Sequence, residues 1–257
     1  MNDPLKRHIL KFLSQDLRFD GRKPLDLRKV EIVIPASANA EGSATVRMGD
    51  TEVMAGIKLS IEKPYPDTPG QGNLVVNAEL LPLSSPDFEA GPPGSESIEI
   101  ARVVDRCLRE AGAIDLKSLC ITPGEAVWTV NVDICTINAA GNLIDVSALA
   151  ALVALMNARM PAHEDGAVDY KHLTDEPVPL REKPIAVTVL KIGDRFVVDP
   201  TYEEEQAIDA RLTVCVTEKG HLCALQKGGD MALGIDEIDA MAGIAIDKSK
   251  ELRKVIP

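Results

Sequence analysis

The stretch "AVWTVNVDICTINAAGNLIDVSALAALVALMN", residues 126–157, decides the fold. Its first part alternates large apolar residues with others, which is the period of a β-strand with one buried side. The apolar side carries Trp128, Val130, Val132 and Ile134. After the turn "AAGN" the chain is apolar on nearly every side of a helical projection, so this helix is expected to be buried on most sides. The stretch therefore predicts a strand that leads directly into a core helix.

The same order, strands followed by a helix, is predicted earlier in the chain. "SATVRMGDTEVMAGIKLSIE" predicts two strands joined by a hairpin turn at Gly49-Asp50. "NLVVNAELLPLS" predicts a further strand. "SESIEIARVVDRCLREAG" then predicts a helix with Ser95 or Ser97 as its N-cap and Gly112 just beyond its end.

The C-terminal part adds "PIAVTVLKIGDRFVVD" and "ARLTVCVTEKGHLCALQKG", two hairpins, and an amphipathic helix from about Asp236 to Lys254. Strands followed by a helix, twice over, predict an α+β protein with two similar halves. We expect one domain over residues 1–257, with halves at about 18–112 and 113–257. Its proline- and acid-rich segment 161–183 is expected to be a surface connection.

The composition of the chain argues against several classes of function. The chain has 257 residues and 45% hydrophobic content, with a formal net charge of −12. This acidity excludes a surface coated with positive charge for non-specific nucleic-acid binding, but not one local basic stripe. Aromatic residues make up only 3%, so base-stacking side chains are few. No apolar run is long enough to span a membrane, and the N-terminus lacks a signal-peptide pattern, so a cytoplasmic protein is expected.

The cysteines show no C-x-x-C spacing and lie in apolar or strand-like segments. They are Cys107, Cys120, Cys135, Cys215 and Cys223. Reduced core thiols are the expected state, and a cross-strand disulfide between Cys215 and Cys223 is the alternative. No metal or cofactor is predicted, because the four histidines are scattered and no glycine-rich nucleotide motif occurs; His163 and His172 are expected to be exposed.

Arg102, Arg106 and Arg109 are spaced so that they share one face of the first long predicted helix. Guanidinium groups suit phosphate oxygens, so this stripe is a candidate nucleic-acid-binding or partner-binding surface. The alternative is a solvated face with internal ion pairs, because acidic residues lie nearby. These are Glu99, Asp105 and Glu110.

The segment "NAAGNLIDVS" resembles a phosphate-binding turn at a helix N-terminus. Leu143 and Ile144 offer no donor side chain, however, and Asp145 places a negative charge in the first turn, where it would repel a phosphate. A turn with Asn142 as helix N-cap is therefore the favoured interpretation.

The segment "VVDPTYEEEQAIDARLTV", residues 197–214, gathers four carboxylates: Asp199, Glu203, Glu204 and Glu205. Paired carboxylates can hold Mg²⁺ or act as general acid and base. Such a site also needs a cationic cradle, and the segment supplies only Arg211. A solvated acidic loop is favoured over an active site.

Five stretches together resemble the RNase PH family. They are "DLRFDGRKPLDLRKVEI", "GSATVRMGDTEVMAGIKL", "EIARVVDRCLREAGAIDL", "PGEAVWTVNVDICTINAAGNLIDVSALAALVAL" and "VVDPTYEEEQAIDARLTV". The resemblance covers about residues 18–228 and implies two βα repeats like domain 2 of ribosomal protein S5. Asp20-Gly21-Arg22 is among its most telling features.

Within the family, the chain looks most like the non-catalytic subunit of the archaeal exosome. Active members hold phosphate with an arginine at the second helix, where this chain has Leu143. Of their spaced aspartates, Asp199 matches the first, whereas Glu205 and Arg211 replace the others. The resemblance thus implies a degenerate former active site comprising Asn142, Leu143, Asp145, Asp199, Glu205 and Arg211.

The resemblance also implies partners. They are a catalytic RNase PH-like subunit, joined in a heterodimer and a ring of three heterodimers, RNA-binding cap subunits, and RNA in a central channel. The arginine stripe would then bind RNA and help to shape the partner's active site. Two alternatives stay open: an active phosphate-dependent 3′–5′ exoribonuclease, and an S5-like module without an RNA role.

Overall fold

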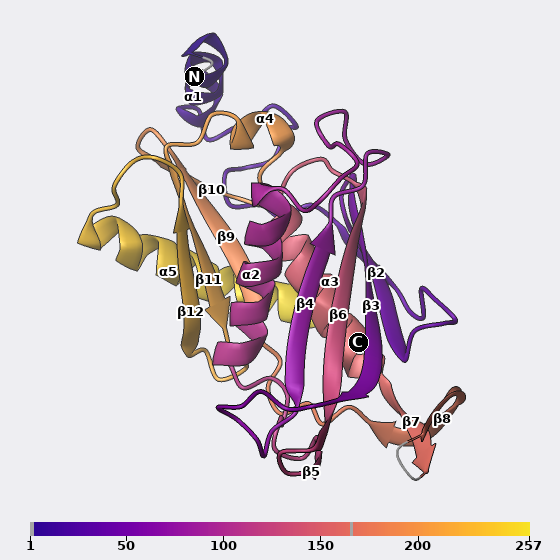
Figure 1. Cartoon of the computed structure of the whole chain (residues 1–257). Helices are drawn as coiled ribbons and strands as arrows, with labels where there is room; N and C mark the ends of the chain where they lie inside the picture. The colour runs from indigo at the N-terminus through magenta and orange to yellow at the C-terminus, as the bar shows by residue number, and fades with distance from the viewer. Residues whose placement is uncertain (1–2, 165–166) are drawn as a thin grey trace.

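The computed structural model describes residues 3–164 and 167–257 (Figure 1). Five α-helices and twelve strands occur in this part of the chain. The helices are α1 (Asp3–Leu13), α2 (Ser95–Glu110), α3 (Leu143–Asn157), α4 (Tyr202–Glu205) and α5 (Ile235–Leu252). The strands are β1 (Val30–Val33), β2 (Gly42–Met48), β3 (Thr51–Glu62), β4 (Asn73–Glu79), β5 (Cys120–Thr122), β6 (Ala126–Asn138), β7 (Arg159–Glu164), β8 (Ala167–Pro177), β9 (Ile185–Ile192), β10 (Arg195–Val198), β11 (Ala210–Val216) and β12 (Leu222–Gly228).

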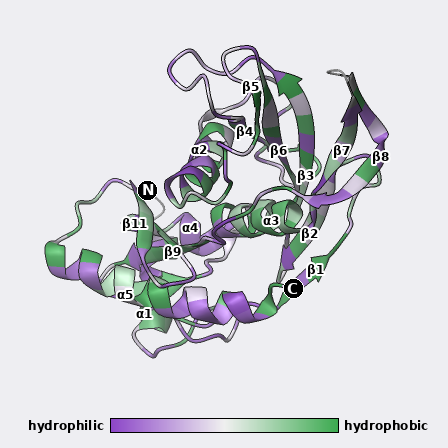
Figure 2. Ribbon diagram, turned by 90° about the horizontal axis from the view of Figure 1, so that it is seen from below, coloured by the Kyte–Doolittle hydropathy of each residue, from purple (hydrophilic) through white to green (hydrophobic). Residues whose placement is uncertain are grey.

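Two sheets enclose the core helix α3. The first sheet has the order β1-β2-β3-β6-β4, with β5 paired to β6, and the second has the order β10-β9-β11-β12. Figure 2 shows α3 between the sheets and α2 beside it. The residues of α3 from Leu143 to Leu155 are all buried, as the all-round apolar pattern predicts.

The outer faces of the two sheets differ. Strand β3 alternates buried and partly exposed residues, because only its inner face meets α3. Strand β9 is buried along almost its whole length, because α3 packs on one face and α5 on the other. Helix α1 closes one end of the second sheet with Ile9 and Leu13, which pack against Leu190 and Ile192.

The predicted α+β class and most predicted elements are confirmed, with three corrections. The N-cap of α2 is Gly94, because the helix begins at Ser95. Segment 161–183 lies largely at the surface, as expected, but it holds most of a β-hairpin, β7–β8. The boundary expected near residue 112 does not separate the sheets, because β6 follows it and still pairs with β3 and β4 in the first sheet.

The remaining structural expectations are also met. His163 and His172 are exposed, although the His163 ring packs edge-on against Trp128. All five cysteines are free thiols, so the Cys215–Cys223 disulfide is not formed. None of the helices in residues 3–164 and 167–257 combines the length and the apolarity needed to cross a bilayer.

The contact between β2 and α3 depends on one glycine. A Cβ on Gly42 would lie 2.5 Å from the Ala154 carbonyl oxygen and 2.5 Å from Ala158 Cα. We therefore expect Gly42→Ala to lower the free energy of unfolding by about 1–3 kcal/mol, the usual cost of overpacking a core. Urea denaturation measures this change.

Gly56→Ala is the matched control. It lies on the neighbouring strand, where an added Cβ would meet nothing closer than Ala40 Cβ at 3.7 Å. Its unfolding midpoint should stay near that of the wild type. Equal midpoints for the two variants would contradict the close β2–α3 approach.

Candidate functional site

The N-terminus of α3 meets the segment that follows β10. The turn before the helix has left-handed backbone at Gly141, with φ 86°, and at Asn142, with φ 62°. A Cβ on Gly141 would lie 2.4 Å from the Pro200 carbonyl oxygen, so only glycine permits this approach. Asn142 is the predicted N-cap residue, but its side chain does not cap the helix.

Asp199 lies at the centre of this junction and is fully buried. Arg28 donates to both of its carboxylate oxygens, at 2.6 and 2.9 Å, and its backbone N–H donates at 2.8 Å. Arg22 donates at 2.9 Å and the Asn142 amide at 3.0 Å. Burial alone would raise the pKa of Asp199, but the hydrogen bonds and charge of Arg28 hold it below its ordinary value.

A second buried ion pair supports the same segment. Arg18 donates through Nε to Glu204 at 2.8 Å and through Nη2 to the other carboxylate oxygen. It also donates to the carbonyl oxygens of Val198 and Asp199, at 3.0 and 2.9 Å. The arginines at positions 18, 22 and 28 thus bind one segment, and reasoning from individual motifs missed their role. The only signal was the Asp20-Gly21-Arg22 stretch within the resemblance.

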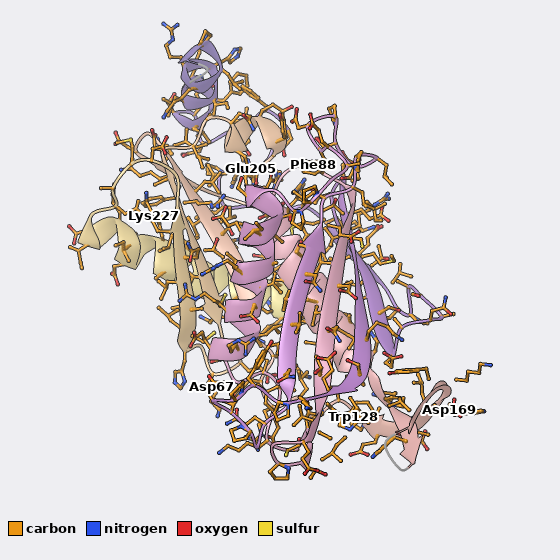
Figure 3. All side chains as sticks on the ribbon, viewed as in Figure 1. Asp67, Phe88, Trp128, Asp169, Glu205 and Lys227 are labelled. Carbon is orange, nitrogen blue, oxygen red and sulfur yellow. The ribbon has the colours of Figure 1, made fainter. Side chains whose placement is uncertain are left out.

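Glu205 accepts a hydrogen bond from the Asn142 backbone N–H at 2.9 Å (Figure 3). Burial raises its pKa to about 7, against the lowering effects of this hydrogen bond and of nearby arginines. A carboxyl group of this chain therefore lies at the N-terminal end of α3, the end of a helix that favours anions. Leu143 lies beside it and is buried, as its apolar side chain requires.

Asp145 contacts the second sheet. Its carboxylate accepts hydrogen bonds from the Thr188 N–H at 2.9 Å and the Thr188 hydroxyl at 2.7 Å, so it is bound to β9. Burial raises its pKa to about 7, although both Thr188 donors act in the opposite direction. Asp145 lies in the first turn of α3, as expected, and Glu205 adds a second carboxyl group at the N-terminus of this helix.

The expectation of a solvated acidic loop is wrong for most of the cluster. Asp199 and Glu204 are buried, Glu205 is partly buried, and only Glu203 is exposed. Arg211 does not join Asp199. It reaches across to α2 and binds Glu99 at 2.5 Å. The structure thus brings Asn142, Leu143, Asp199 and Glu205 together and leaves Asp145 and Arg211 facing other partners.

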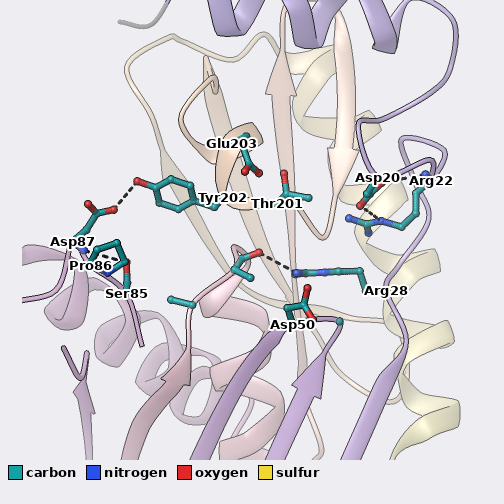
Figure 4. Close-up of a pocket in the computed structure, with 13 residues that line it drawn as sticks. Asp20, Arg22, Arg28, Asp50, Ser85, Pro86, Asp87, Thr201, Tyr202 and Glu203 are labelled. Atoms are coloured by element: carbon teal, nitrogen blue, oxygen red, sulfur yellow. Dashed lines mark hydrogen bonds and ion pairs between the residues drawn. The ribbon is translucent and has the colours of Figure 1, made fainter. Parts of the chain in front are cut away.

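Two hollows flank this junction. The larger, of about 680 Å³, is shown in Figure 4 and is walled by Asp50, Asp87 and Glu203, with the Tyr202 hydroxyl donating to Asp87 at 2.6 Å. The smaller, of about 290 Å³, has Leu143 and Glu205 among its lining residues. Among residues 3–164 and 167–257, no cluster of three or more His, Cys, Asp and Glu side chains is arranged to hold a metal ion.

The arginine stripe lies on α2, and its three members differ in their bonding. Arg109 donates to Asp105 at 2.6 and 3.1 Å and to the Leu74 carbonyl oxygen at 3.0 Å. The hydrogen bond to Asp105 raises the pKa of Arg109. Arg106 donates to the Gln226 side-chain oxygen at 3.1 Å. Arg102 is exposed and has no hydrogen bond or ion pair with the residues that the structure describes.

Family models match both parts of this architecture. The first domain of the 3′ exoribonuclease family, RNase PH, matches residues 26–161, and the second domain matches residues 183–248. The chain therefore belongs to the RNase PH family.

Curated relatives are similar over almost their whole length. The exosome complex component Rrp42 of Archaeoglobus fulgidus is 44% identical over 253 residues, which cover 98% of this chain and 95% of the relative. The component of the same name from Methanothermobacter thermautotrophicus is 41% identical over 249 residues, covering 96% and 92%.

Solved structures agree with this assignment. A chain of the Archaeoglobus fulgidus exosome with RNA bound to the active site superimposes with a TM-score of 0.91 at 43% identity, covering 98% of this chain and 97% of that one. A chain of an archaeal exosome core gives 0.87 at 40% identity, covering 98% and 96%. Rice Rrp46, at 18% identity and a TM-score of 0.71, shares the fold.

The raised pKa of Asp145 predicts a pH dependence of stability. Below its ordinary pKa of 3.8, Asp145 is protonated in both states. Between about pH 4 and 7 the folded protein holds a proton that the unfolded chain releases, so this contribution to stability is lost as the pH rises. Asp145→Asn, which cannot titrate, should remove it.

Urea unfolding of wild type and Asp145→Asn at several pH values measures this effect. The free energy of unfolding of the wild type should fall relative to that of the variant by up to about 1.4 kcal/mol per pH unit in this window. Exposed Asp67 supplies the control, Asp67→Asn. A constant wild-type-to-variant difference from pH 4 to 7 would show that Asp145 is ionised throughout.

Proposed function

We propose that this chain is a non-catalytic, Rrp42-like subunit of an archaeal exosome, the complex that degrades RNA from its 3′ end by phosphorolysis. It acts in the cytoplasm, in a ring of three heterodimers with a catalytic RNase PH-like partner and RNA-binding cap subunits. It contributes a scaffold, an RNA-binding helix and support for the partner's active site. Similarity to Rrp42 components over nearly the whole chain supports this assignment.

The non-catalytic part of the proposal rests on one observation: carboxylates of this chain bind groups that a phosphate would need. Phosphorolysis requires an inorganic phosphate held in line with the scissile phosphodiester. Here the N–H at the start of α3 binds Glu205, and two of the nearby guanidinium groups, of Arg22 and Arg28, bind Asp199. The Asn142 N–H and the Arg22 and Arg28 guanidinium groups are thus already paired with carboxylates of the same chain, and the Leu143 side chain adds no donor.

The bonding of the α2 arginines supports an RNA-binding role. Arg102 is exposed and has no partner within the described part of the chain, so it can meet a phosphate without breaking a bond to those residues. Arg109 is paired with Asp105, and a phosphate must compete with that carboxylate. We therefore assign the first contact with the RNA backbone to Arg102. Arg106 and Arg109 are held by Gln226 and Asp105 and add positive charge beside Arg102.

Phosphorolysis of an oligo-A RNA tests the assignment directly. The assay compares this chain alone, its catalytic partner alone and the two mixed, with release of nucleoside diphosphates as the readout. We expect no product from this chain alone and the highest rate from the mixture. Phosphate-dependent product from this chain alone would contradict the proposal and revive an active exoribonuclease.

The arginine stripe is tested in the assembled complex. Arg102→Glu with Arg106→Glu should weaken RNA binding and flatten the slope of log affinity against log salt by about two, because about two phosphate contacts are lost. Lys29→Glu is the control, since its side chain is 81% exposed and lies beside β1, at the far edge of the first sheet. Equal salt slopes for both variants would mean that α2 does not contact RNA.

A further inference from the structure

The former catalytic segment and the RNA-binding helix are connected by one ion pair. We propose that Arg211 is a positioning residue for RNA binding, which holds α2 through Glu99 in the orientation that presents Arg102 to RNA. This inference rests on the proposed RNA-binding role of α2. It assigns a present function to a position that, by the family resemblance, belonged to the active site.

The geometry joins Arg211 to the correct face of α2. Arg211 lies at the start of β11, and its Nη2 is 2.5 Å from Glu99 Oε1. Glu99 precedes Arg102 by three residues and Arg106 by seven, so the three side chains follow one another along a single helix face. Arg211 also faces Glu96, in the first turn of α2. Burial raises the pKa of Glu96, and the charge of Arg211 partly offsets this rise.

The residue opposite Arg211 is a glycine, which leaves room for the guanidinium group. Gly228 is its cross-strand neighbour on β12, and a Cβ there would lie 2.5 Å from Arg211 Nε and 2.9 Å from Cζ. Gly228 does not have left-handed backbone, so it serves to make room for the guanidinium group. Arg211 Nε is buried without a hydrogen-bond partner among the described residues, which leaves the terminal nitrogens to make the bond to α2.

A second connection lies two turns further along the helix. Arg106 donates to the Gln226 side-chain oxygen at 3.1 Å, on β12. The Glu99 and Arg106 contacts therefore hold α2 at two points against adjacent strands of the second sheet (Figure 1). Arg102 lies between these points. Two contacts on one face restrict rotation of α2 about its own axis. They therefore fix the side of the molecule from which the Arg102 side chain projects.

The Arg211–Glu99 ion pair is better suited to orienting α2 than to stabilising the fold. The side chains of Arg211 and Glu99 are 22% and 37% exposed, and ion pairs this open to solvent contribute little to folding. Their loss should therefore move or loosen the N-terminal half of α2 while the apolar face of the helix stays packed. The consequence is expected in RNA affinity, since the chemical step belongs to the partner.

The experiment uses the reconstituted complex with the catalytic partner and an oligo-A RNA. Arg211→Met and Glu99→Gln should each raise KM for RNA by about two- to fivefold, the range that a partly exposed ion pair supports, with kcat unchanged. The double variant should resemble either single variant, because both changes remove the same interaction. Arg211→Lys, which keeps the charge, should retain most of the wild-type affinity.

Arg47→Met is the matched control, because Arg47 also forms an exposed ion pair, with Glu52 at 2.8 Å, but on β2 and β3, away from α2. Glu99→Gln is a conservative change at a helix surface and keeps the test valid if Arg211→Met does not fold. Unchanged KM in Glu99→Gln, or additive effects in the double variant, would overturn the inference. If Arg102→Glu with Arg106→Glu weakens RNA binding and these variants do not, the proposed function stands and only this inference fails.

Discussion

The burial of the Asp199 carboxylate is the constraint on which the functional end of the molecule depends. A fully buried charge needs compensating partners, and these come from distant parts of the chain: Arg22 and Arg28 near the N-terminus, and Asn142 before α3. The backbone of Asp199 is itself left-handed, with φ 46°. Removing the carboxylate would take from Arg28 its ion-pair partner and leave Arg22 with Asp20. The N-terminal segment, the α3 turn and the second sheet are thus linked through one side chain.

The same interactions support the proposal that this member of the RNase PH family is not catalytic. An active site for an anion must keep its cationic groups and helix N–H groups available, whereas this chain pairs them with Asp199 and Glu205. Positive charge remains available on α2, at Arg102, in a protein whose net charge is −12. The chain therefore keeps the RNase PH architecture with Asp199 and Glu205 paired internally, and under our proposal the exposed Arg102 is the group that α2 offers to RNA.

The periodicity of apolar residues predicts most helices and strands correctly. Apolar residues alternate along β3, which is buried on one side, and occur all around α3, which is buried on all sides. Periodicity failed for β6, which was assigned to the second half although it pairs with β3 and β4. Strand pairing is a long-range choice, and no local pattern distinguishes one neighbouring strand from another. The burial of the acidic segment escapes prediction for the same reason: the arginine partners of Asp199 and Glu204 lie more than 170 residues away.

The sequence by itself determined the α+β class, the buried helix, the arginine stripe and the RNase PH resemblance. Each of these depends on residue types at short spacings, or on stretches that can be recognised one at a time. Only the tertiary structure decided that Glu205 covers the end of α3, that Asp145 binds Thr188, and that Arg211 binds Glu99. The direction of a charged side chain depends on which hydrogen-bond donor or opposite charge the fold brings within about 3 Å, and that proximity is a property of the packed chain alone.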